Sequence, residues 1–183
     1  MSWEQFLLSF VAAIIGGGAA GAGITAYVQH RRHEKEKTDA VTYLAHVLAF
    51  EFEGYAIACA EKLSDAEPDH HEMQEPGNVG SLPDAPMLPQ SPAYQWLSHD
   101  LRERAFAFPQ DIAATRRSLA YIWQVADVDD YDQQAIRELS TFGLNAAALA
   151  ADLRAAHQVA PRRLGTQHWD IVDYLRKKQG RRA

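Results

Sequence analysis

A run of apolar residues near the amino terminus constrains this chain more than any other feature. Residues 6–28 include no Asp, Glu, Lys, Arg or His side chain. As an α-helix this run would measure about 34 Å, enough to cross a hydrocarbon core about 30 Å thick. Trp3 and Tyr27 flank it, and their rings favour the two membrane–water interfaces. The sequence therefore predicts a transmembrane helix within an anchor segment, residues 1–33.

A cleaved signal peptide is the alternative interpretation of the same run. The apolar stretch 6–15 is followed by the small residues Ala-Gly-Ala at 20–22, as at a cleavage site. Against this, residues 1–5 lack the Lys or Arg with which export signals normally begin. Positive charge directly after the run also resists translocation, and the basic residues there are Arg31, Arg32, Lys35 and Lys37. The positive-inside rule then places the amino terminus outside and the body in the cytoplasm, for example at a bacterial inner membrane.

Small residues recur at every fourth position of the predicted span, so they would line one stripe of the helix. They are Ser9, Ala13, Gly17, Gly21 and Thr25. Gly17 and Gly21 form a GxxxG pattern, which lets two helices approach closely inside lipid. The stripe predicts a homodimer or a membrane-protein partner, although Gly and Ala are also frequent in membrane helices without such a role.

Charge is divided unevenly along the chain. The formal net charge is −1 over residues 1–28, +2 over 29–37, −12 over 38–161 and +5 over 162–183. The basic tail within the last segment comprises Arg176, Lys177, Lys178, Arg181 and Arg182. Such a tail can complement a helix dipole or return to an anionic membrane surface. Binding to nucleic acid is disfavoured because the neighbouring body is acidic, so no nucleic-acid partner is expected.

Apolar spacing predicts an all-α body over residues 34–183, an antiparallel bundle of about four helices. Helical periodicity covers 34–63, with an apolar stripe at Val41, Leu44, Ala45, Leu48, Phe52, Tyr55, Ala56, Cys59 and Leu63. It resumes over 94–108, and Pro109 is expected to end that helix and begin the next. A further helix follows an acidic loop at 127–132, and a short one covers roughly 168–178. No strand-like alternation is evident.

Residues 64–93 are predicted to connect two of these helices. Six of the eight prolines lie here, which excludes a regular helix. Pro83, Pro86, Pro89 and Pro92 recur every third residue and would share one edge of a polyproline II helix. We expect a stiff surface connector, with a ligand for an aromatic-lined groove as the alternative.

Residues able to bind a metal are few and poorly spaced. The densest cluster is Asp69, His70, His71 and Glu72, in the Pro-rich connector. Asp127, Asp129 and Glu138 fit three positions of a calcium loop, but Asp132 stands where the loop requires Gly. Both sets are weak candidates, and the sequence predicts no metal or other cofactor.

Catalytic motifs are not evident, and the chain resembles no family of known activity. The single cysteine, Cys59, lies on an apolar stripe, where a thiol is usually inert packing. The sequence therefore predicts a membrane scaffold or adaptor rather than an enzyme, with the bilayer and a protein as partners and no small-molecule substrate indicated. Two alternatives stay open: a membrane-tethered metal-dependent sensor or enzyme using His70/His71 or the 127–132 loop, and an exported domain.

Overall fold

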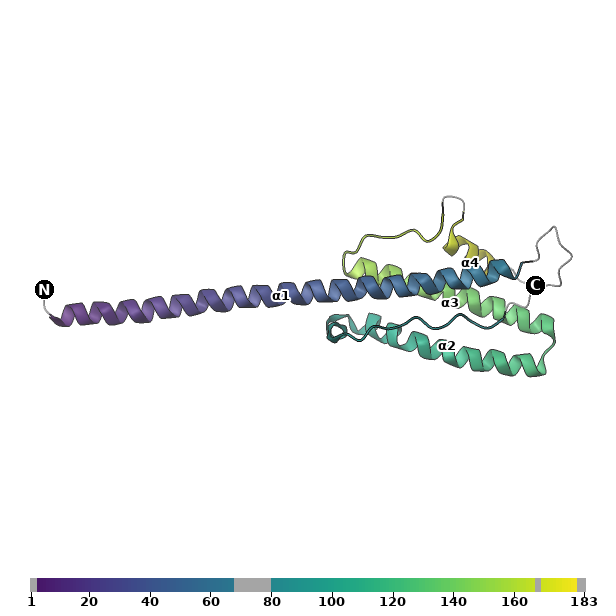
Figure 1. The fold of residues 1–183 in the computed structure, drawn as a ribbon, viewed down its shortest axis with the longest axis horizontal. Helices are drawn as coiled ribbons and strands as arrows, with labels where there is room; N and C mark the ends of the chain where they lie inside the picture. Colours follow the sequence, from purple (N-terminus) through teal and green to yellow (C-terminus); the bar gives the residue numbers. More distant parts are fainter. Residues whose placement is uncertain (1–2, 68–79, 167–168, 181–183) are drawn as a thin grey trace. The chain divides into compact units, whose positions relative to one another are not determined.

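The computed structural model describes residues 3–67, 80–166 and 169–180, with side chains from Tyr27 onward except that of Asp129. The elements are α1 (Trp3–Asp65), η1 (Pro92–Trp96, a 3-10 helix), α2 (His99–Val125), α3 (Val128–Ala156) and α4 (Ile171–Gly180) (Figure 1). Among the described residues the sole β-type pairing is an isolated bridge between Gly165 and Asp170. The predicted all-α class and the bundle of four helices are confirmed.

The chain divides within α1 into two units, residues 1–40 and 41–183. In the first unit the hydroxyl of Thr38 donates to the Glu34 carbonyl at 2.9 Å, and Lys37 pairs with Glu34 at 3.8 Å. No helix in the described part of the chain is both long enough and apolar enough to cross a membrane. The side chains of Ser9, Ala13, Gly17, Gly21 and Thr25 lie outside the described ones. The span and its association stripe therefore remain predictions.

The second unit, here called the body, contains the hydrophobic core. Its part of α1 buries the stripe predicted from spacing, at Val41, Leu44, Ala45, Leu48, Phe52, Tyr55, Ala56, Cys59 and Leu63. Phe108 of α2 sits at the centre of an aromatic cluster, with ring centroids 5.3 Å from Phe52, 5.3 Å from Tyr55 and 5.7 Å from Phe142. These edge-on contacts join α1, α2 and α3 into one core.

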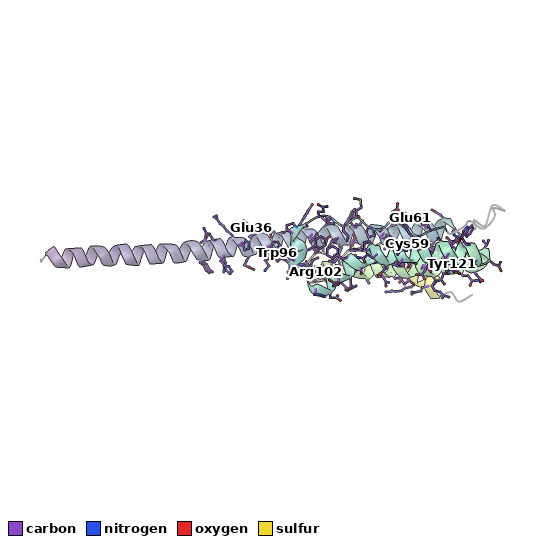
Figure 2. All side chains as sticks on the ribbon, turned by 90° about the horizontal axis from the view of Figure 1, so that it is seen from below. Glu36, Cys59, Glu61, Trp96, Arg102 and Tyr121 are labelled. Atoms are coloured by element: carbon purple, nitrogen blue, oxygen red, sulfur yellow. The ribbon has the colours of Figure 1, made fainter. Side chains whose placement is uncertain are left out.

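Helix α3 runs antiparallel to both α1 and α2, so α1 and α2 run parallel to each other and the predicted antiparallel arrangement holds for only part of the body (Figure 1). Between α2 and α3, Arg104 pairs with Asp152 at 2.8 Å, whereas Trp123 near the end of α2 packs on Tyr131 near the start of α3. Figure 2 shows Trp96 and Tyr121 toward opposite ends of this body, with Cys59 between them. The long axes of the helices therefore lie alongside one another.

One predicted helix boundary is wrong. Pro109 lies inside α2, which continues unbroken from His99 to Val125. The buried residues Leu101, Ala105, Phe108, Ile112 and Leu119 form one stripe across the proline. Proline in a helix interior removes one backbone hydrogen bond and costs about 3 kcal/mol. Burial of apolar side chains on both sides of Pro109 offsets that cost, so two predicted helices become one.

The prediction of an acidic loop at 127–132 is also wrong for most of these residues, which are helical. Helix α3 begins at Val128, and Asp127 is its N-cap residue, with an extended backbone at ψ 157°. The Asp127 side chain accepts no capping hydrogen bond. Most of the acidic residues therefore belong to the first turns of α3, where negative charge favours the positive end of the helix dipole.

The described part of the Pro-rich connector, residues 80–91, is non-helical but is not a simple surface linker. Leu82 is fully buried, and its carbonyl accepts a hydrogen bond from Arg116 of α2 at 3.0 Å. The same guanidinium pairs with Asp84 at 2.8 Å. At the start of the segment, the hydroxyl of Tyr131 donates to the Gly80 carbonyl at 3.3 Å. The segment is thus part of the packed body.

Candidate functional site

A buried ion pair joins α1 to the end of α3. Arg154 donates through Nε to Oε1 of Glu53 at 2.5 Å and through Nη2 to Oε2 at 3.0 Å. The side chains of Arg154 and Glu53 are 8% and 3% exposed. This bidentate geometry is the strongest that a guanidinium and a carboxylate adopt, and it raises the pKa of Arg154 above its usual value.

The chain after α3 is held against this pair. Gln158 has a left-handed backbone, φ 55°, which ends α3, and the Val159 amide donates back to the Arg154 carbonyl at 2.9 Å. Nη1 of Arg154 donates to the Ala160 carbonyl at 3.0 Å. Arg162 then reaches Oε2 of Glu53 at 3.2 Å. One buried carboxylate therefore fixes two arginines from different segments.

A tight return in the chain brings residues 162–166 beside the start of α4. Gly165 has φ 117°, and a side chain there would lie 2.0 Å from the Trp169 carbonyl oxygen, so only glycine fits. The Ile171 amide donates to the Leu164 carbonyl at 3.2 Å. Asp170 caps α4, since its Oδ1 accepts from the amides of Val172 at 3.0 Å and Asp173 at 3.2 Å.

These contacts enclose a cavity of about 470 Å³, here called the arginine cavity. It lies between the second half of α3, residues 159–164 and the first turns of α4, with Glu53 of α1 on its wall. Its lining residues are Glu53, Ala147, Ala151, Arg154, Ala155, Val159, Pro161, Arg162, Arg163, Leu164, Asp170, Val172, Asp173 and Arg176. The volume is within the range of small-molecule sites.

The lining combines an apolar wall with a charged rim. Alanines of α3, together with Val159, Leu164 and Val172, supply the apolar part. Four arginines and three carboxylates supply the charge, so the lining is formally +1 on a body, residues 41–183, that carries −6. Such a reversal of sign focuses the local potential on anions.

A second surface feature lies at the turn between α2 and α3. Four large apolar side chains are exposed there, and we call them the turn patch: Tyr121, Trp123, Val125 and Val128. Tyr121 is 66% exposed, whereas the Trp123 ring packs on Tyr131 with a centroid distance of 4.9 Å. Tyr121 and Trp123 are two residues apart, so they leave α2 on different sides, and the turn patch is a set of exposed side chains around the turn. Exposed Tyr and Trp residues are frequent in protein-binding surfaces.

A smaller groove of about 340 Å³ runs between α1 and the extended connector. Phe50 and Met87, both exposed, stand on its two sides. Phe50 also receives the guanidinium of Arg162 over its ring, 5.7 Å from the centroid. The groove therefore adjoins the ion-pair network without sharing the arginine cavity.

The residues of the predicted basic tail do not form one surface: some contact the body and others are exposed or lie outside the described residues. Arg176 lines the arginine cavity and pairs with Asp173 at 3.3 Å. Lys178 pairs with Glu67, and Lys177 is exposed in the last turn of α4. Arg181 and Arg182 lie outside the described residues. Their interpretation as a membrane-contacting tail is not tested.

The basic residues predicted at the membrane edge lie on α1. Arg31, Arg32 and Lys35 are exposed, and Lys37 is half-buried. Arg31 stacks over the Tyr27 ring at 5.5 Å. Their place at a membrane edge remains a prediction.

The structure does not test the densest cluster of predicted metal ligands. Asp69, His70, His71 and Glu72 lie outside the described residues. Elsewhere in the described ranges, no three His, Cys, Asp or Glu side chains are placed to hold one metal ion. The metal-dependent alternatives therefore stay untested predictions.

Reasoning from the sequence named Arg176, as part of a basic tail, but missed the other charged residues of the arginine cavity. Glu53 had a signal, because it shares the helix face of the buried alanines Ala49, Ala56 and Ala60. Arg154 similarly follows Ala150 at helical spacing. A charged residue on an apolar stripe indicates a buried partner, but spacing alone does not say which residue that partner is.

Comparison of the chain with protein-family models, with curated proteins and with solved structures finds no match.

Proposed function

We propose that this chain is a single-pass membrane protein whose body binds a partner protein and so acts as a scaffold or adaptor. The observation that carries the proposal is the turn patch, since four large apolar side chains are exposed around the turn between α2 and α3. Trp and Tyr are the residue types that most often dominate binding energy at protein interfaces.

The anchor rests on the sequence. Residues 6–28 carry no charged side chain, and four basic residues follow within nine positions. A span of that length matches the bilayer, and the basic cluster favours a cytoplasmic body. Tethering to a membrane raises the effective concentration of a body relative to membrane partners, which suits an adaptor.

Membrane fractionation tests the anchor. The wild-type chain is expected in the membrane pellet after an alkaline wash, whereas Ile14→Lys with Ile15→Lys should release it because two buried charges oppose insertion. The matched control, Ile14→Leu with Ile15→Leu, should stay in the pellet. Release of the wild type, or a mature mass lacking residues 1–28, would contradict the anchor; the second result would support the exported alternative.

Protease added outside intact spheroplasts tests the orientation. A cytoplasmic body is protected until the membrane is opened with detergent. Digestion of the body before detergent is added would show the opposite orientation.

A photocrosslinking amino acid placed at position 121 tests the turn patch. We expect one defined adduct whose yield falls at least fivefold when Val125→Asp is added, because Val125 is exposed one turn after position 121 on the same face of α2 and a charge there opposes an apolar contact. The same amino acid at exposed Glu103, outside the patch, is the positional control. Adducts of equal yield at both positions, or a lone monomer at both, would contradict a partner at this surface.

Association through the span is a separate part of the proposal. Gly17→Leu with Gly21→Leu should abolish self-association in a membrane-based energy-transfer assay, because bulky side chains separate the helices. Gly18→Leu, which lies off the stripe, should not. If the wild type shows no transfer, the stripe has no role in homodimerisation, and a hetero-partner is then sought by crosslinking within the span.

A further inference from the structure

The arginine cavity combines features that a purely structural ion-pair network does not need. Glu53 and Arg154 already satisfy each other in the interior. Three additional arginines nevertheless stand at the edge of the cavity, on two different segments: Arg162, Arg163 and Arg176. Their side chains are 47%, 64% and 67% exposed, so their charges are accessible from water.

These rim arginines retain donors for a ligand. Arg162 contacts Glu53 through Nη1, Arg163 contacts Asp170 through Nε at 3.5 Å, and Arg176 contacts Asp173 through Nη1. A guanidinium has five N–H groups, and each of these pairs uses one nitrogen. The paired carboxylates hold the guanidinium groups in place while leaving further N–H groups for an anion such as phosphate or carboxylate.

The floor of the cavity fits an apolar group. Ala147, Ala151 and Ala155 follow one another at four-residue spacing on one face of α3, and their small side chains leave the volume open. Val159 and Leu164 close the sides. A fully ionic or strongly hydrated ligand would leave this surface unused, whereas a short hydrocarbon chain would bury it.

We propose that the arginine cavity binds a small anionic amphiphile. Its phosphate or carboxylate is held by the rim arginines, and its hydrocarbon part lies against the alanines of α3. This goes beyond the adaptor proposal and is independent of the turn patch, which is built from other residues. The same headgroup chemistry occurs in soluble alkyl phosphates and in anionic lipids, so the test separates these two sources.

Calorimetric titration of the full chain in nonionic detergent tests the proposal, with hexyl phosphate as the probe. Hexyl phosphate is expected to bind at least tenfold more tightly than inorganic phosphate, which lacks the chain, and than hexanol, which lacks the anion. Hexanol also corrects for partition into detergent. Equal affinity for hexyl phosphate and either of these comparison compounds overturns the proposal.

Variants locate the binding within the cavity. Arg163→Ala with Arg176→Ala should weaken hexyl phosphate binding at least tenfold, whereas Lys177→Ala, also on α4 but outside the lining, should leave it unchanged. Ala151→Leu, which fills the floor, should weaken binding similarly, and Ala156→Leu at the end of α3 should not. Unchanged helical circular dichroism shows that each variant is folded. Undiminished binding in both cavity variants overturns the proposal.

Nanodiscs identify the source of the ligand. If phosphatidylglycerol nanodiscs suppress hexyl phosphate binding and phosphatidylcholine nanodiscs do not, a membrane lipid occupies the cavity. If binding persists in both, the occupant is a soluble amphiphile. Loss of binding in both nanodisc types, despite binding in detergent, overturns the proposal because the cavity is then inaccessible in a bilayer.

Discussion

Glu53 and Arg154 show how a charged pair is tolerated inside a helical bundle. Removing two charges from water costs several kcal/mol per ion, and only good geometry offsets that cost. Here the pair is bidentate, and the remaining donors and acceptors are used by the Ala160 carbonyl and by Arg162. The pair therefore matters more for fixing the 157–170 segment than for net stability.

Removal of one partner should be costly. Arg154→Met leaves the Glu53 carboxylate buried with Arg162 alone, and we expect the free energy of unfolding to fall by about 3 kcal/mol. Glu53→Met with Arg154→Met removes the buried charge as well and should lose at least about 1 kcal/mol less than the single change. Urea titrations followed by circular dichroism measure both values. A double variant less stable than Arg154→Met would contradict the cost assigned here to a buried carboxylate that has lost Arg154.

Cys59 should be nearly inert in the folded chain. Burial raises the pKa of its thiol to about 12, so little thiolate exists near neutral pH. We expect alkylation by iodoacetamide at pH 8 to be on the order of 100-fold slower in the folded chain than in urea. Because the folded pKa is above the ordinary value of 9.0, the stability linked to this thiol is full below pH 9 and is lost as pH rises toward 12. Equal alkylation rates in the two states would contradict the burial of Cys59.

At the scale of the helix, apolar periodicity predicts which face is buried. Single residues such as Pro109 do not predict where a helix ends. The stripe on α1 was predicted residue by residue because one face of that helix is buried along its whole length in the body. Pro109 misled because its backbone penalty is local, whereas burial of Phe108 and Ile112 on either side is a tertiary effect. The same holds for the start of α3, where acidic residues resemble a loop in sequence but begin a helix.

Gly143 of α3 lies where α1 and α4 both pack closely against it. A side chain there would lie 2.8 Å from Cδ1 of Leu175 on α4 and 3.1 Å from Cβ of Cys59 on α1. We expect Gly143→Ala to lower the free energy of unfolding by about 1–3 kcal/mol, because overpacking outweighs the better helix propensity of alanine. Gly54→Ala is the control, since nothing lies within 4 Å of a side chain there, and it should stabilise α1 slightly. A stabilising Gly143→Ala would contradict this packing.

The candidate site was less predictable than the helices. The pattern placed Arg176 in a basic tail, but Arg163 and Arg162 reach the same cavity through the return at Gly165. That return depends on the positive φ of Gly165. The position of Arg162 depends on its contact with Glu53, which lies 109 residues earlier in the chain. Periodicity describes which face of a helix is buried, not which distant charges meet.

At the scale of the whole molecule, the chain consists of an amino-terminal helix and a body with its own core. All the buried apolar residues described lie in the body, from Val41 onward. We therefore expect residues 38–183 to fold without the first segment. Their melting temperature should be within a few degrees of that of the full chain, and they should stay in the supernatant after membranes are pelleted. Unfolded or pelleted residues 38–183 would contradict this independence.

The buried Leu82 has a consequence for how the chain would meet a protease. A protease must draw several residues of extended backbone into its active-site cleft, and an exposed loop between helices is where such cuts usually fall. Here the side chain of Leu82 is in the core and its carbonyl is held by Arg116, so this stretch can be withdrawn only by opening the body. Residues 80–91 therefore resemble a loop in sequence, but their cleavage by a protease should report unfolding of the whole body.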